Sequence, residues 1–160
     1  MVVEEGLFRE PVLRDFQCQR AWAQIGGVIQ PARGIEIETF LDANLPLLQL
    51  DPARIKQVIL NLLINARQAM SERGHGRITV ITRPDSAAGH GEIVEIVDDG
   101  PGMDADTLAR AFEVYYSTKK GGSGLGLALV RRVIEAHGGQ VEMQSSPGHG
   151  TRVMLRLPRS

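Results

Sequence analysis

The chain has 160 residues, 42% of them hydrophobic and 23% charged, which provides for one ordinary globular core. A formal net charge of −1 with both signs interspersed is unlike a nucleic-acid-binding protein, which usually carries a basic face or tail. The single cysteine, Cys18, cannot form an internal disulfide, and no secretion signal or membrane-spanning apolar run is evident. We therefore expect one cytoplasmic, monomeric domain at residues 8–160, preceded by a linker remnant at residues 1–7.

The first third of the chain predicts one helix and two short strands. Apolar residues at roughly helical spacing predict a helix from about Phe8 to Ile29, and Pro31 to Gly34 ends that pattern. Ile35 to Phe40 alternates with period two, which predicts a half-buried strand. Leu47 to Leu50 follows a turn and is expected to form a short partner strand.

The strongest helix signal comes next. Asp51 suits a helix cap and Pro52 suits the first turn, so we expect a helix that runs to about Glu72. Its core face consists of apolar residues three or four positions apart: Ile55, Val58, Ile59, Leu62, Leu63, Ala66, Ala69 and Met70.

The rest of the chain predicts paired strands with helices between them. The strands are Ile78 to Thr82 and Ile93 to Asp98, which should form a hairpin, and Gln140 to Ser145 and Thr151 to Leu157. A short helix is expected from Asp104 through Phe112, and a longer one from near Gly124 to His137-Gly138. This order predicts an α+β fold, a two-layer α/β sandwich in which helices cover one face of a mixed sheet.

Three amide side chains form a stripe beside the apolar face of the long helix. Asn61, Asn65 and Gln68 occupy positions i, i+4 and i+7. On spacing alone, a solvated polar edge is the more frequent explanation of such a stripe. The alternative is a magnesium site, because an amide oxygen is a good ligand for this cation beside phosphate oxygens.

The strand that ends at Asp98 carries a carboxylate toward the core side, because Asp98 shares the side of Val94 and Ile96. A buried carboxylate needs donors. Turn amides of Asp98-Asp99-Gly100-Pro101-Gly102 could supply them, or the carboxylate could accept from a ligand amino group such as that of adenine. The residues alone leave both interpretations open.

A glycine-rich segment, Ser117 to Leu127, leads directly into the longer helix. Glycine amides and the positive end of a helix dipole suit phosphate. The segment matches neither a P-loop nor a Rossmann turn. Lys119 could neutralise a terminal phosphate, although two adjacent lysines are more often part of a solvated loop.

Together these motifs resemble the N, G1, F, G2 and G3 boxes of sensor histidine kinases, in the right order and over about Phe8 to Pro158. The boxes are Asn61-x-x-x-Asn65, Asp98-x-Gly100-x-Gly102, Phe112, Gly122-x-Gly124-x-Gly126 and Gly148-x-Gly150-Thr151. The segment from Phe112 to Lys119 is most similar to the nitrogen-regulation class, except that Val114 stands where that class usually has proline.

The resemblance implies a Bergerat ATP-binding fold that holds ATP and Mg²⁺ between two helices and a lid. It implies that Asn65 ligates magnesium, that Asp98 accepts from the adenine amino group, and that Thr151 supports the adenine through Asp98. It implies catalytic roles for Asn61, Asn65 and Lys119. The further nucleotide contacts that it implies are Gln68, Ala69, Gly100, Gly102, Met103, Tyr116, Thr118, Lys119, Gly122, Gly124, Leu125, Gly126 and Leu127.

The implied reaction is phosphoryl transfer to a histidine on a separate dimerisation helix of the same kinase, with a response regulator downstream and no nucleic-acid partner. Gyrase-type and MutL-type ATPases share the fold but typically carry a general-base glutamate at the position of Asn61, and an amide cannot serve as that base. A nucleotide-binding switch without catalysis is the other alternative. His75, His90, His137 and His149 lie in predicted loops or at a helix end, so we expect none of them to be the acceptor.

Overall fold

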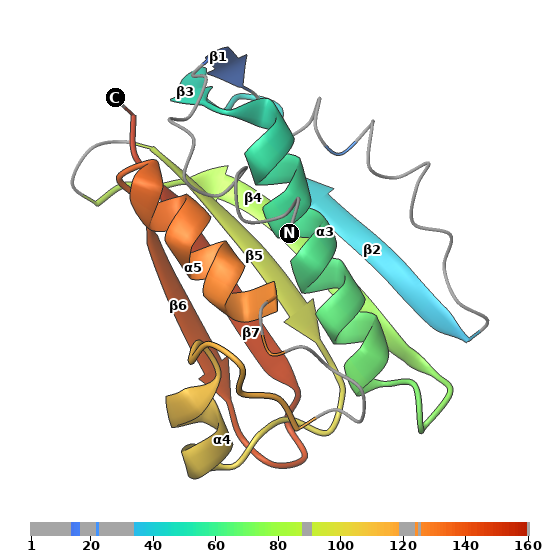
Figure 1. Cartoon of the computed structure of the whole chain (residues 1–160). Helices are drawn as coiled ribbons and strands as arrows, with labels where there is room; N and C mark the ends of the chain where they lie inside the picture. The colour runs from blue at the N-terminus through green and yellow to red at the C-terminus, as the bar shows by residue number, and fades with distance from the viewer. Residues whose placement is uncertain are drawn as a thin grey trace.

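The computed structural model of the chain describes residues 14–16, 22, 34–87, 91–118, 124 and 126–159. The main sheet has five strands: β2 (Ile35–Leu41), β4 (Gly76–Pro84), β5 (Glu92–Asp98), β7 (Thr151–Leu157) and β6 (Gln140–Ser145), in that spatial order. Two long helices, α3 (Pro52–Ala69) and α5 (Gly126–Ala136), lie side by side across one face, and the short helix α4 (Ala105–Arg110) lies at one end (Figure 1). This is the predicted α+β sandwich.

Helix α3 begins as its sequence predicts. The Asp51 carboxylate accepts hydrogen bonds from the backbone N–H groups of Ala53 and Arg54, at 3.1 and 3.3 Å, and Pro52 occupies the first turn. The helix ends at Ala69, earlier than the predicted Glu72, because the chain turns there toward β4. Met70 caps this end and is fully buried.

The core lies between the two long helices and the sheet. Alternate residues of the central strands point to the helices, as the pleat requires, and pack on the apolar face of α3. The buried residues of this core include Ile55, Val58, Leu62, Leu63, Ile78, Val80, Val94, Ile96, Val130, Ile134, Val153 and Leu155.

The predicted first helix is wrong over Arg14–Phe16, which form strand β1. This strand pairs antiparallel with β3 (Leu48–Leu50) in a separate two-stranded sheet. Leu48 and Leu50 are buried, so the backbone of β3 needs a hydrogen-bonded neighbour, and that requirement overrides helical spacing. Trp22 is helical and packs against the core, and the other residues of the predicted helix lie outside the described ranges.

The expected pairing of the Ile35 strand with the Leu47 strand is also wrong. β2 pairs in parallel with β4 instead. Parallel strands need a long crossover connection, and the 18-residue helix α3 between them supplies it. The chain leaves the main sheet at Asp42, whose N–H donates to Thr82 Oγ1 at 3.0 Å.

The other predicted elements are confirmed. β4 and β5 form an antiparallel hairpin, and β6 and β7 have the predicted bounds. Asp104 caps α4 through the N–H of Thr107, at 2.8 Å. Helix α5 ends two residues before Gly138, whose φ of 75° lies in the left-handed region.

A histidine joins the end of α5 to the start of α3. His137 Nε2 accepts from the N–H of Asp51 at 3.0 Å, and His137 Nδ1 lies 2.7 Å from the carbonyl oxygen of Val133. The two helices are therefore linked where α5 ends and α3 begins. At the opposite end, the start of α5 and the end of α3 lie near the tip of β5 (Figure 1).

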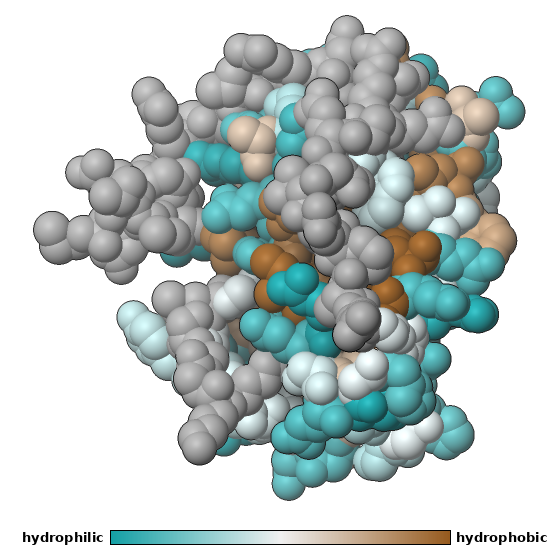
Figure 2. All heavy atoms as spheres, turned by 90° about the vertical axis from the view of Figure 1, so that its right-hand side faces the viewer, coloured by the Kyte–Doolittle hydropathy of each residue, from teal (hydrophilic) through white to brown (hydrophobic). Residues whose placement is uncertain are grey.

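Apolar and polar residues are both exposed on the described surface. Seen from the side of β2, apolar residues form patches in the middle of the face and hydrophilic residues dominate below them (Figure 2). The large apolar side chains that are exposed within the described ranges are Phe40, Leu47, Ile64, Val114 and Tyr115. Within those same ranges, a helix with the length and hydropathy of a membrane span does not occur.

A buried carboxylate organises the face of the sheet opposite the helices. Glu95 on β5 is 3% exposed and lies between Arg83 on β4 and Arg152 on β7, at 2.9 and 2.6 Å. Burial raises the pKa of Glu95, but the hydrogen bonds from Arg152 and Arg83 lower it by more, so the net shift is downward. The ionised carboxylate thus links three adjacent strands.

We expect Glu95→Gln to lower the free energy of unfolding at neutral pH by about 1 to 2 kcal/mol, because both arginines lose their anion. A lowered folded-state pKa contributes stability that is present above the unfolded value, 4.5, and is lost as the pH falls through the folded value. The difference between the two proteins should therefore shrink as denaturation is measured from about pH 7 to about pH 3.

Glu142→Gln is the matched control, because that carboxylate is half exposed and lies 3.4 Å from Arg156. It should change stability by less than about 0.5 kcal/mol. A Glu95→Gln penalty that stays constant over the whole pH range would contradict the assigned role of the ion pairs.

Candidate nucleotide-binding site

Asp98 ends β5 on the side of the helices, as its alternation with Val94 and Ile96 predicts. It is 8% exposed and pairs in register with Ile78 on one side and Thr151 on the other. Its Oδ1 accepts the N–H of Gly100 at 2.9 Å, so a turn amide does donate to this carboxylate. The carboxylate is thereby held at the end of the central strand, facing the layer of helices.

The glycines after Asp98 permit close approach of two turns. Gly102 has a φ of 72°, and a Cβ there would collide with the carbonyl oxygen of Ser146. Gly150, with a φ of 70°, packs in the same way on the carbonyl oxygen of Asp98. The N–H of Gly148 donates to the carbonyl oxygen of Pro101 at 2.7 Å. The turn after β5 and the turn between β6 and β7 therefore form one packed unit.

Ser145 is also part of this unit, although the sequence analysis did not predict a role for it in the site. Its Oγ accepts from the N–H of Met103 at 2.9 Å and donates to the carbonyl oxygen of Gly150 at 2.8 Å. It also lies 2.9 Å from Thr151 Oγ1. Only the pairing of Ser145 with Thr151 across β6 and β7 could have indicated its position.

Helix α3 carries two of the predicted residues toward opposite walls of the site. Ala69 Cβ lies 3.7 Å from the position of a Cβ on Gly100, and Asn65 Nδ2 lies 3.8 Å from that of a Cβ on Gly126. Residues four apart share a helix face, so α3 connects the end of β5 with the start of α5. Asn61, one turn earlier, is half-buried, and Gln68 is exposed.

Before α5, Gly124 packs against the backbone of Tyr115 and Tyr116. The N–H of Tyr115 donates to the carbonyl oxygen of Gly124 at 3.0 Å. Gly124 has a φ of 70°, and a Cβ there would collide with the backbone of Tyr115 and Tyr116. The Arg110 guanidinium lies 4.2 Å from the centre of the Tyr116 ring, which anchors the segment to α4.

The structure describes part of the predicted phosphate loop. Lys119, Gly122 and Leu125 lie outside the described residues, whereas Thr118 is exposed and Leu127 is half-buried and packs against the core. The structure thus brings together Asn65, Ala69, Gly100, Gly102, Met103, Asp98, Thr151 and Gly126.

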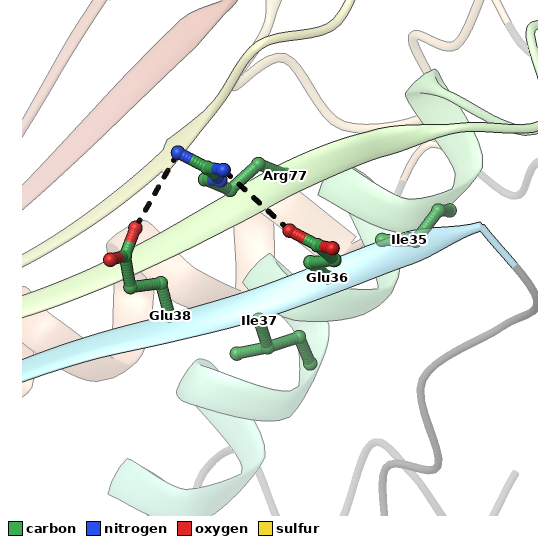
Figure 3. A pocket seen from close by; sticks show the side chains of 5 residues that line it. All are labelled: Ile35, Glu36, Ile37, Glu38 and Arg77. Atoms are coloured by element: carbon green, nitrogen blue, oxygen red, sulfur yellow. Dashed lines mark ion pairs between the residues drawn. The ribbon is translucent and has the colours of Figure 1, made fainter.

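A separate, open pocket of about 440 Å³ lies on β2 and β4 (Figure 3). Arg77 reaches both Glu36 and Glu38, at 3.6 and 3.7 Å, and Ile35 and Ile37 complete the lining. Its charged groups are exposed and pair with one another. We therefore assign the functional site to the end of β5.

Comparisons with known proteins identify the family to which this chain belongs. Residues 50–160 match the protein family described as histidine kinase-, DNA gyrase B- and HSP90-like ATPase. The chain is 41% identical over 133 residues to the sensor histidine kinase ZraS of Escherichia coli strain K12, covering 82% of this chain and 28% of that protein. It is 37% identical over 130 residues to the sensory histidine kinase/phosphatase NtrB of Vibrio alginolyticus, covering 77% of this chain and 37% of that one.

The fold is also found among solved structures. Full-length ShkA in complex with AMPPNP superposes with a TM-score of 0.80 and 29% sequence identity, over 94% of this chain and 32% of that one. The chain therefore spans between 28% and 37% of the length of these three proteins.

Proposed function

Because this chain belongs to the family of histidine kinase-, DNA gyrase B- and HSP90-like ATPases, and its relatives include sensor histidine kinases, we propose that it is a kinase catalytic domain. The proposed activity is binding of Mg-ATP and transfer of the γ-phosphoryl group to a histidine on a separate dimerisation helix. The placement of Asp98 among the glycine turns, beside the end of α3 and the start of α5, is the observation that carries the proposal.

Asp98 is proposed to recognise adenine. Its carboxylate lies at the end of β5 with Oδ1 fixed by the Gly100 N–H, so its orientation is defined before a ligand arrives. A carboxylate accepts from the adenine amino group, whereas guanine would present an oxygen there. Gly100 leaves the space beside the carboxylate without a side chain, since a Cβ there would lie 2.8 Å from Asp98 Oδ1.

Asn65 is proposed to hold the magnesium ion that accompanies the phosphates. Its amide nitrogen lies 3.8 Å from the position that a Cβ would occupy on Gly126, the first residue of α5. An amide oxygen suits magnesium, and the free N–H groups at the start of an 11-residue helix suit phosphate. The bound ion would neutralise phosphate charge, with Gln68, Thr118 and Lys119 proposed as further phosphate contacts.

An ATP hydrolase is the second candidate within the same family. It is disfavoured because Asn61 is an amide and cannot take a proton from water at neutral pH. A neutral imidazole needs less activation, because it is already a nucleophile. The proposed partners follow from this reaction: the acceptor helix of the same kinase and a response regulator, in the cytoplasm where ATP is available.

The histidines that the structure describes are poor acceptors. Both ring nitrogens of His137 are engaged, with the Asp51 N–H and the Val133 carbonyl. His75 and His149 lie next to glycines in loops and are not on a helix. The acceptor is therefore proposed to lie outside this chain.

Asp98→Ala should weaken ATP binding by about tenfold to a hundredfold, because a charge-assisted hydrogen bond to the base is lost. The unsubstituted chain should bind ATP more tightly than GTP, measured by calorimetry. Glu38→Ala, in the pocket on β2, should leave ATP affinity unchanged. Equal affinity for ATP and GTP in the unsubstituted chain would refute the adenine assignment.

With labelled ATP and magnesium, the isolated chain should form no stable phosphohistidine and hydrolyse ATP slowly. Adding the acceptor helix in trans should label that helix, weakly, because the covalent link that raises its effective concentration is absent. Asn65→Ala, or replacement of the acceptor histidine, should abolish the label. Acid-labile label on this chain alone, or rapid ATP turnover without a partner, would identify another branch of the family.

A further inference from the structure

Arg73, in the turn between α3 and β4, uses all three of its guanidinium nitrogens. Its Nη2 donates to Asp99 Oδ1 at 2.8 Å, its Nη1 donates to the carbonyl oxygen of Asp99 at 2.9 Å, and its Nε donates to the carbonyl oxygen of His75 at 2.9 Å. One planar group therefore spans two segments that are distant in sequence and holds them in a fixed geometry.

Asp99 is held from the strand side as well. Its Oδ1 also accepts the N–H of Arg77 at 2.9 Å, and its own N–H donates to the carbonyl oxygen of Arg77 at 3.3 Å. The hydrogen bond from the Arg77 N–H lowers the pKa of Asp99, and the hydrogen bond from Arg73 lowers it further. Burial opposes both effects, but the pKa stays below its ordinary value. Asp99 is thus an anion at neutral pH, as the contact with Arg73 requires.

Space for this contact is provided by a glycine. A Cβ on Gly76 would lie 2.7 Å from Arg73 Nη2 and 2.8 Å from Asp99 Oδ1, and would collide with the sulfur of Met70. The side chain of Met70 in turn lies against Gly100, since a Cβ there would be 3.2 Å from Met70 Cγ. The turn after α3 and the turn after β5 are therefore fitted to each other.

The contact reaches the nucleotide site through one peptide group. Arg73 Nη1 binds the carbonyl oxygen of Asp99, and the N–H of the same peptide unit, that of Gly100, donates to Asp98 Oδ1. A cation on the carbonyl of a peptide fixes its plane and strengthens its N–H as a donor. The path runs from the Arg73 guanidinium through the Asp99–Gly100 peptide to the Asp98 carboxylate.

We propose that Arg73 is a positioning residue for base recognition, which orients the Asp98 carboxylate through the Asp99–Gly100 peptide. The inference rests on the proposed function, because it assumes that Asp98 accepts from the adenine amino group. Arg73 does not itself touch the nucleotide. Its effect should therefore be confined to ligands that carry the amino group.

The test compares affinities for ATP and for inosine triphosphate, which has an oxygen in place of the amino group. Arg73→Gln should weaken ATP binding by about two- to tenfold and leave inosine triphosphate binding unchanged. Arg73→Lys, which retains the charge but not the fork, should recover part of the loss. Arg156→Gln is the control, since that arginine pairs with Asp85 at the opposite end of the sheet and should alter neither affinity.

A double-mutant cycle separates positioning from general destabilisation. In the Asp98→Ala background, Arg73→Gln should have no further effect on ATP affinity, because the group it orients is gone. Equal losses for both nucleotides, or an additive loss in that background, would overturn the inference. Should Arg73→Gln fail to fold, Arg73→Lys and Asp99→Asn carry the same comparison.

The same measurements distinguish a failure of the proposed function from a failure of the positioning role. If the unsubstituted chain binds ATP no better than inosine triphosphate, the adenine assignment itself is wrong. If the unsubstituted chain discriminates and Arg73→Gln discriminates equally well, the adenine site stands and the positioning role is wrong.

Discussion

The site depends on a carboxylate that is fixed at the end of the central strand. Asp98 is bordered on both sides by paired strands, and the N–H of Gly100 donates to it. A buried carboxylate is costly unless donors surround it, so the turn after β5 must fold tightly back on Asp98. The glycines of that turn and of the turn between β6 and β7 make this possible, since Gly102 and Gly150 approach backbone oxygens that no other residue could approach.

The two long helices form the rest of the site around the Asp98 carboxylate. His137 ties the end of α5 to the start of α3, and at the other end the amide of Asn65 lies beside Gly126. Ala69, one turn after Asn65, lies 3.7 Å from the position that a Cβ would occupy on Gly100, in the turn after β5. A single helix therefore sets the distance between the group proposed to recognise the base and the helix start proposed to meet the phosphates.

Most of this arrangement could be predicted from the sequence, because local rules governed it. Asp51 and Pro52 marked the start of α3, period-two alternation marked β5, and the spacing of Asn61, Asn65 and Gln68 placed the amides on one side. The pairing of β1 with β3, and of β2 with β4, could not be predicted, because pairing is decided by long-range burial rather than by the pattern within a strand. Ser145 and Arg73 were missed for the same reason, since each acts on a residue distant in sequence.

The central claim, that nucleotide binds between the end of β5 and the start of α5, is tested most directly by following backbone amide resonances while Mg-ADP is added. The largest shifts should fall on Gly100, Gly102, Met103 and Gly126, with little change at Glu36 and Glu38. Shifts centred on the pocket of β2 and β4, with the turn after β5 unchanged, would contradict the account.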